Sequence, residues 1–246
     1  MTADRTALKR LWMQAFGDPE EIPDAFFATA FSPARHNAIW INGTPASALY
    51  WLDCSLNSSR FAYIYAVATD NAFRGQGYAG KLIEDTHRLL KQKGYAGAVL
   101  VPGEPWLFGF YQKFGYRVFN TVQEFTCTSG GQPVELKPLD CVCYANARQK
   151  YLPAGGILQE KETLAYLQTQ AAFYSGKDFV FAASQQNGTL VVHELLGNSQ
   201  AAEGILRALS LPQGHFRTPG EGKDFAMFCP LQETCPTPTY FGLALD

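Results

Sequence analysis

Ten residues, FRGQGYAGKL at 73–82, limit the fold of this chain more than any other segment. They follow an apolar run, Phe61–Thr69, that is rich in aromatic and β-branched residues, and they open a stretch, 78–93, whose apolar residues recur at helical spacing. The run predicts a central strand that is apolar on both faces. The stretch predicts a helix that ends at Gly94. Strand, glycine-rich turn and helix in this order are typical of an α/β domain.

The glycines of this turn predict a phosphate-binding site. A helix N-terminus presents unpaired N–H groups and a partial positive charge. Gly75, Gly77 and Gly80 remove the Cβ atoms that would hold a ligand away, and glycine also permits left-handed dihedrals. Arg74 adds a cation. The segment is therefore interpreted as a cradle for a pyrophosphate, although a plain turn in which the glycines serve only packing would use the same residues.

The segments around this turn predict the other elements of the first half. The pair Asn42-Gly43 is a strong hairpin signal between two apolar runs. The remaining patterns predict helices at Leu8–Phe16 and Asp24–Ala30, a strand at Ala96–Pro102, a short helix at Trp106–Lys113 and a strand at Tyr116–Thr126.

A second half follows a stretch of small residues and turn formers at Thr128–Pro138, which is the best candidate for a domain boundary. Its patterns predict helices near Ala145, at 161–174 and at 201–209, and strands at 177–184 and 189–196 around a second Asn-Gly turn. The order hairpin, strand, helix resembles that of the first half and indicates a weak internal repeat.

Composition excludes several classes of protein. A hydrophobic fraction of 47% predicts a globular chain, and a net charge of −2 without blocks of like charge favours neither a nucleic-acid nor a membrane partner. The N-terminus lacks the apolar core of a signal peptide, and no segment has the length of a membrane span. The six cysteines show no metal-ligand spacing, so no metal site is expected. They are read as reduced, mostly buried thiols of a cytoplasmic protein.

Two motifs of the first half resemble a known family. RGQGYA fits neither the Walker pattern nor the dinucleotide fingerprint. It is similar to the Q/R-x-x-G-x-G/A pyrophosphate arm of the GNAT N-acetyltransferase superfamily. FYQKFGY at 110–116 resembles the FY-x-K-x-G-Y/F ending of the same domain. The resemblance covers about Leu8 to Thr126 and implies an α/β fold of the GNAT type, with a mixed, splayed central sheet flanked by helices.

The resemblance also implies a co-substrate, acetyl-CoA, and the residues that bind it. In this family the strand before the arm pairs with the pantetheine like an added strand. Those positions are Val67 and Thr69, although ordinary core packing would also explain Val67. The residues implied to surround the pyrophosphate are Arg74, Gly75, Gln76, Gly77, Tyr78, Ala79 and Gly80.

Tyr111 falls where many GNAT enzymes carry the tyrosine that protonates the leaving CoA thiolate. An aromatic residue on the buried face of a short helix would look the same. Tyr116 is expected to be structural. Glu104 stands where many members have an asparagine, and the central strand carries no carboxylate to serve as base. Water, Glu104, Asp70 and the C-terminal carboxylate of Asp246 all stay open as bases.

The second half most resembles the cofactor-free half of two-GNAT acetyltransferases, of which the enhanced-intracellular-survival type is one example. The equivalent turn, GNSQAA at 197–202, lacks the arginine and the further glycines, so no CoA site is expected there. The resulting domains are 1–128, which binds acetyl-CoA, and 136–246, a degenerate GNAT-like domain, without the sterol-carrier-like domain of that type. His193 and His215 are expected to be structural or surface residues.

The expected function is an acetyl-CoA-dependent N-acetyltransferase with a small-molecule amine as acceptor. The alternative is a non-catalytic module that binds or senses acyl-CoA. The residues do not separate acetyl from other acyl groups, or an amine from a hydroxyl acceptor. A homo-oligomer is possible, and no motif of the second half identifies the acceptor.

Overall fold

The computed structural model describes residues 2–159 and 161–245, which fold into two compact units that interleave along the chain. The first unit contains the residues up to Leu100, Glu104–Arg117 and Phe228–Pro236. The second contains Val101–Gly103, Val118–Met227 and the residues from Thr237 onward. The predicted limits of 1–128 and 136–246 divide the chain at a single place, and they stay a prediction.

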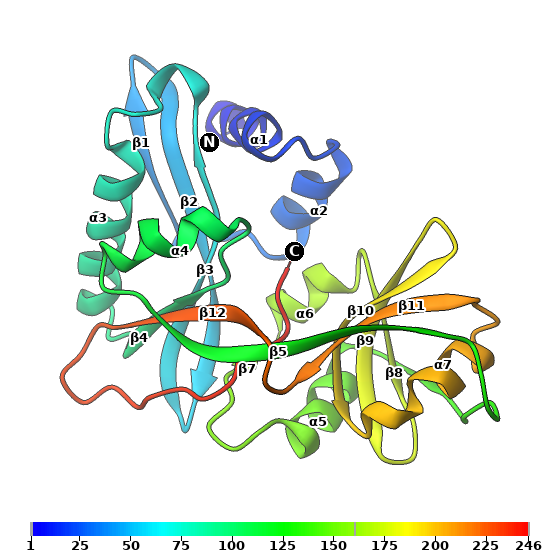
Figure 1. Cartoon of the computed structure of the whole chain (residues 1–246). Coiled ribbons are helices and arrows are strands. Elements are labelled where there is room, and N and C mark those ends of the chain that lie inside the picture. Colours follow the sequence, from blue (N-terminus) through cyan, green and yellow to red (C-terminus); the bar gives the residue numbers. More distant parts are fainter. Residues whose placement is uncertain (1, 160, 246) are drawn as a thin grey trace. The chain divides into compact units, whose positions relative to one another are not determined.

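The first unit is a mixed sheet flanked by helices, as the sequence predicts (Figure 1). Its elements are α1 (Thr2–Phe16), α2 (Glu21–Thr29), β1 (His36–Ile41), β2 (Thr44–Leu56), β3 (Ser59–Thr69), the 3-10 turn η1 (Asn71–Phe73), α3 (Tyr78–Gln92), β4 (Gly97–Leu100) and α4 (Pro105–Gln112). The strand order is β1-β2-β3-β4, antiparallel except for the parallel pair β3 and β4.

The two faces of this sheet are buried by different helices (Figure 1). The indole of Trp12 on α1 packs on Tyr50 and Tyr65, with ring centroids 5.7 and 5.4 Å apart. On the opposite face, the hydroxyl of Thr86 on α3 accepts a hydrogen bond from the side chain of Asn37 on β1. The predicted hairpin is confirmed, since Asn42 and Gly43 have φ of 48° and 77°, as a tight β-turn requires.

A late segment of the chain completes the first unit. The strand β12 (Lys223–Pro230) lies beside β4, and its residues from Phe228 onward belong to this unit. The Phe228 ring packs on Phe61 at 5.9 Å and lies so close to Gly97 that a Cβ there would stand 2.5 Å from the ring. The backbone N–H of Leu231 then donates to the carbonyl of Ala96.

The second unit is also built on mixed pairing of strands. Its elements are β5 (Arg117–Thr128), β6 (Lys137–Leu139), α5 (Cys141–Tyr151), β7 (Leu158–Gln159), α6 (Glu162–Leu167), β8 (Ala172–Ser175), β9 (Phe179–Gln186), β10 (Thr189–Gly197), the 3-10 turn η2 (Ser199–Ala201), α7 (Ala202–Ala208), β11 (Gln213–Pro219) and the start of β12. The strand order is β5-β11-β10-β9-β8-β6.

One predicted helix of this unit is wrong over its second part. The pattern at 161–174 predicts one helix, but α6 ends at Leu167 and Ala172–Ser175 is the strand β8. β8 pairs with β6 and β9, and its Phe173 is buried in a stack on Tyr144 of α5, with centroids 4.2 Å apart. The pairing and burial available to these residues outweigh a helical pattern that spacing alone supports.

A buried ion pair ties α5 to β10. Arg148 Nε and Nη2 donate to the two carboxylate oxygens of Glu194 at 2.6 and 3.0 Å, and both side chains are at most 1% exposed. The hydroxyl of Tyr240 donates to the same carboxylate at 3.1 Å. Because the two buried charges are paired with each other, loss of either one leaves the other charge uncompensated in the core.

We expect Glu194→Gln to lower the free energy of unfolding by about 3–5 kcal/mol, the cost of leaving one buried charge unpaired. Glu124→Gln in the same unit is the control, because Glu124 pairs with Arg217 from an exposed position, and a change under about 1 kcal/mol is expected there. Urea unfolding of both variants measures the difference. Equal losses would show that Arg148 does not depend on this carboxylate.

Candidate active site

The parallel ladder between β3 and β4 is short. Phe61, Ala62 and Tyr63 pair with Gly97, Ala98 and Val99, and among the described residues no later residue of β3 pairs with β4. At the same place β3 bulges away from the regular register with β2, and Ala66 has φ of 49°, which is unusual for a residue with a side chain. The end of β3 is therefore left without a ladder partner on its β4 side.

Val67 and Thr69, the predicted pantetheine positions, lie on this unpaired end. Both are half-buried. The hydroxyl of Thr69 lies 3.0 Å from the hydroxyl of Ser47 on β2, which itself donates to the carbonyl of Ala68. These contacts hold β3 on β2 alone, so its other edge is open for an added strand. Binding at Val67 and Thr69 stays a prediction.

The turn after β3 has the conformation that its glycines predict. The carboxylate of Asp70 accepts a hydrogen bond from the N–H of Ala72 at 2.8 Å and so caps η1. Gly75 and Gly77 then adopt φ of 74° and 80°, and a Cβ at either position would meet no atom within 4 Å. Both glycines are thus required by the backbone, and the space beside them is open.

The start of α3 has unpaired N–H groups. Gly77 is its N-cap residue and provides no side chain, so the first-turn donors have neither helical partners nor a capping group. The first turn carries no acidic residue, and the exposed Arg74 lies just before it, its Nε 3.4 Å from the carbonyl of Thr69. Gln76 donates to the carbonyl of Ala72, and Tyr78 packs on Phe73. The geometry has the features of an anion site.

Gly80 has an additional reason to be glycine. A Cβ at this position would lie 2.8 Å from Cζ of Phe114, in the turn that follows α4. Close packing of α3 against this turn therefore accounts for the third glycine. Its role and that of Ala79 in a phosphate cradle stay predictions.

Tyr111 lies near the end of α4 with its ring buried. The ring makes an edge contact with Tyr116, with centroids 5.7 Å apart, and no hydrogen bond to its hydroxyl is present within residues 2–159 and 161–245. Burial raises the pKa of the Tyr111 phenol, so it stays protonated at neutral pH. A protonated phenol without a partner is suited to donate to a group that gains negative charge.

A histidine that the sequence does not single out lies behind this tyrosine. His87 Nε2 of α3 is 2.9 Å from the hydroxyl of Tyr116, which is buried. Burial lowers the pKa of His87 to about 4, so the ring is neutral at neutral pH. Only the three-dimensional approach of α3 to the start of β5 brings the two residues together.

No general base is identified among the described residues. Asp70 uses its carboxylate as a cap, and Glu104 is an exposed N-cap of α4 without a capping hydrogen bond. The third candidate, Asp246, lies outside the described residues. Neither Asp70 nor Glu104 is therefore placed as a base, and the role of Tyr111 as proton donor stays a prediction.

The second unit repeats the local order of the first. β10 pairs with β11 in parallel from Thr189 to Val192, a register shift follows, and η2 and α7 come after the strand. Here, however, side chains of β11 donate to backbone carbonyls of β10: Arg217 donates to the carbonyl of His193 at 3.4 Å and Thr218 to that of Leu195 at 2.9 Å. The absence of a CoA site in this half stays a prediction.

The turn of the second unit also differs from that of the first. A Cβ on Gly197 would lie 2.3 Å from the carbonyl oxygen of Asp178, so no open space remains beside this glycine. The helix that follows, α7, has only 7 residues and carries Glu203 in its first turn, where an acidic side chain disfavours a phosphate.

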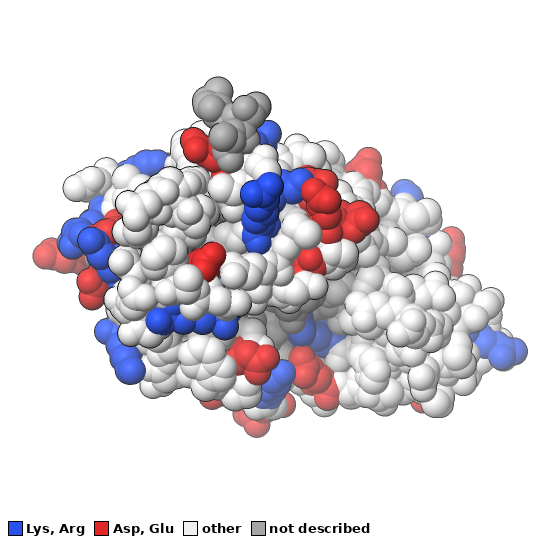
Figure 2. Space-filling view, turned by 90° about the horizontal axis from the view of Figure 1, so that it is seen from above, with Lys and Arg blue, Asp and Glu red and all other residues white. Residues whose placement is uncertain are grey.

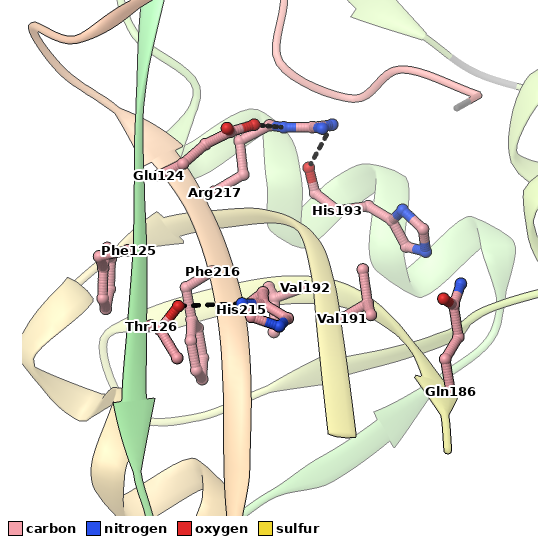
Figure 3. A pocket seen from close by; sticks show the side chains of 10 residues that line it. All are labelled: Glu124, Phe125, Thr126, Gln186, Val191, Val192, His193, His215, Phe216 and Arg217. Atoms are coloured by element: carbon pink, nitrogen blue, oxygen red, sulfur yellow. Dashed lines mark hydrogen bonds and ion pairs between the residues drawn. The ribbon is translucent and has the colours of Figure 1, made fainter. Parts of the chain in front are cut away.

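A hollow of about 410 Å³ lies over the strands β5, β11, β10 and β9 of the second unit (Figure 3). His215 Nδ1 is 2.9 Å from the Thr126 hydroxyl, and Arg217 lies against Glu124. His193, on β10, is 3.0 Å from the Ser184 hydroxyl. The two histidines are thus bonded to neighbouring hydroxyls on the sheet, as expected for surface residues.

No group of three or more His, Cys, Asp or Glu that could hold a metal occurs in the part of the chain that the structure describes. The six cysteines are free; two are buried and Cys143 is exposed, so the expectation of mostly buried thiols is wrong.

None of the described helices is long and apolar enough to cross a membrane. On the face in Figure 2, cationic and anionic side chains are interspersed.

Comparison with known proteins identifies the family. The model of the acetyltransferase (GNAT) domain matches residues 2–119. This match identifies a GNAT acetyltransferase domain in residues 2–119, and acyl transfer is the class of enzyme activity that it supports. No curated protein matches the chain.

Solved structures share the fold over both halves. A probable N-acyltransferase from Enterococcus faecalis is 16% identical, with a TM-score of 0.68 over 93% of this chain and 70% of its own. Eis1 from Mycobacterium abscessus is 12% identical, with a TM-score of 0.69 over 94% and 72%. A putative acetyltransferase from Pyrococcus horikoshii is 15% identical, with a TM-score of 0.62 over 98% and 90%.

The lowered pKa of His87 predicts a pH dependence of stability. The unfolded chain binds more protons than the folded chain between about pH 6.5 and pH 4, so the stabilisation is complete above about pH 6.5 and is lost as the pH falls toward 4. Thermal midpoints across this window should therefore fall less steeply in His87→Gln than in the wild type. Part of the slope will remain, because burial also lowers the pKa of His36. Identical slopes in the two proteins would contradict the prediction.

Proposed function

We propose that the chain is an acetyl-CoA-dependent N-acetyltransferase that transfers the acetyl group to a primary amine by direct attack. The observation that carries this proposal is the start of α3, with Gly75 and Gly77 in left-handed conformations beside open space and with no capping side chain. This is the geometry that a pyrophosphate requires. The acceptor proposed is a small-molecule amine in the cytoplasm, without nucleic-acid or membrane partners; self-association is left open.

The pyrophosphate and the pantetheine of the co-substrate each have a proposed contact. The N–H groups of 75–80 and the Arg74 cation hold the pyrophosphate, and the unpaired edge at Val67 and Thr69 pairs with the pantetheine amides. This extended pairing brings the thioester along β3. Gln76 and Tyr78 add side-chain contacts beside the arm.

The chemistry is an acyl transfer in which one bond forms and one breaks. The lone pair of a neutral amine attacks the thioester carbonyl, and a C–N bond forms in a tetrahedral oxyanion. The intermediate then expels the thiolate as the C–S bond breaks. Tyr111 donates its proton to the sulfur, the nitrogen loses a proton to water, and a proton from water then restores the Tyr111 phenol. An amine that arrives neutral needs no carboxylate base, which agrees with the lack of one on β3.

Gly77→Glu is expected to abolish measurable acetyl-CoA binding in isothermal titration, because it places bulk and negative charge in the cradle. Gly43→Glu is the matched control. It puts the same side chain at a glycine with φ of 77° and open space, but in the β1–β2 hairpin. Unchanged affinity in Gly77→Glu, or equal losses in both variants, would reject the cradle.

Tyr111→Phe is expected to lower kcat by about 10²-fold and to leave acetyl-CoA affinity nearly intact, because a proton donor acts on the leaving group and not on binding. Thiol release with spermidine, kanamycin, lysine and a short peptide as acceptors measures the effect. Equal turnover by the two proteins would remove Tyr111 from the mechanism. Tight binding without turnover on any amine would instead favour the non-catalytic acyl-CoA-binding module.

A further inference from the structure

The helix α3 contacts the turn after α4 at two places along its length. Near its start, Gly80 packs on the ring of Phe114. Two turns later, His87 is hydrogen-bonded to the hydroxyl of Tyr116 at 2.9 Å. The helix that begins at the anion cradle is therefore fixed to the segment that follows Tyr111 by one apolar and one polar contact.

The His87–Tyr116 contact satisfies a buried hydroxyl. Tyr116 is 3% exposed, and a buried hydroxyl without a partner costs about 1–3 kcal/mol. His87 Nε2 is the partner that the structure provides, and the two rings lie 5.3 Å apart. Replacement of His87 by an apolar residue would leave the Tyr116 hydroxyl unsatisfied and would free the ring to shift.

Tyr116 in turn contacts Tyr111 through both ring and backbone. The two rings meet edge to face at 5.7 Å, and the N–H of Tyr116 donates to the carbonyl of Tyr111 at 3.4 Å. The Tyr111 hydroxyl itself has no hydrogen bond to any described residue. Its position is therefore set by packing, and Tyr116 is one wall of that packing.

We propose that His87 and Tyr116 form a positioning pair, which holds the Tyr111 hydroxyl at a fixed place relative to the start of α3. This inference rests on the proposed function, since it assigns the pair to the step in which Tyr111 acts. Neither residue touches the reacting atoms. Loss of the pair is therefore expected to lower kcat, because misplacement of a proton donor by about 1 Å can lower the rate by up to about 10²-fold.

The test compares His87→Leu, Tyr116→Phe, the double variant and His87→Gln in the full chain. Acetyl-CoA and the amine of the panel that the wild type turns over fastest are the substrates. We expect each single apolar variant to lower kcat about tenfold, with the dissociation constant of acetyl-CoA within about twofold of the wild type. The double variant should lose little more than either single one, because the two residues act as one unit.

Rescue separates positioning from general destabilisation. Gln can offer its side-chain amide to the Tyr116 hydroxyl, so His87→Gln should recover at least about half of the wild-type kcat. Tyr95→Phe is the control: its hydroxyl accepts from the Trp51 indole at 3.1 Å in the same unit, away from α4. It should lower the thermal midpoint and leave kcat unchanged.

Three outcomes would overturn the inference. Wild-type kcat in Tyr116→Phe and His87→Leu would show that Tyr111 is placed without the pair. Additive losses in the double variant would show that the residues act independently. A fall in kcat that tracks the thermal midpoint in all variants, Tyr95→Phe included, would reduce the pair to a structural role. Tyr111→Phe tells the two proposals apart: if it lowers kcat by about 10²-fold while the pair variants keep the wild-type kcat, only this inference fails.

Discussion

The end of the ladder between β3 and β4 determines how the first unit is arranged. Two parallel strands that stay paired bury all their backbone groups on the shared edge, and nothing can be added between them. Here the pairing stops after Tyr63, and the bulge at Ala66 bends β3 away. The chain must then turn within a few residues to start α3, which brings a helix N-terminus next to an open strand edge. Both features on which the proposed acyl-CoA site rests thus follow from one interruption of the sheet.

Strong local signals predicted most of the first unit. The Asn42-Gly43 turn, the apolar run of β3 and the glycines before α3 each have one favourable conformation, and the structure has it. The strand β8 was missed because one of its two pairing partners, β6, lies far before it in the sequence, and local spacing does not reveal such a partner. His87 was missed because nothing in its local pattern marks it; only the approach of α3 to Tyr116 gives it a role.

The second unit has a similar order of elements but a different use of them. At its interrupted ladder, Arg217 and Thr218 donate to the backbone carbonyls of His193 and Leu195. The backbone around Gly197 is packed against Asp178, where Gly75 and Gly77 face open space. The two halves therefore share an order of elements. They differ in what bonds the backbone beside the interrupted ladder: side chains of the protein in the second unit, and the proposed co-substrate in the first.

The return of the chain into the first unit at Phe228 has a consequence for synthesis. Strand β4 obtains its outer neighbour only from β12, and Leu231 bonds the carbonyl of Ala96. A ribosome that has made the helices and strands of the N-terminal half has thus made a sheet with an open apolar edge. The nascent unit keeps this edge until β12 and Leu231 have emerged, so a chain that is released before this point would expose an aggregation-prone strand and not a working fragment.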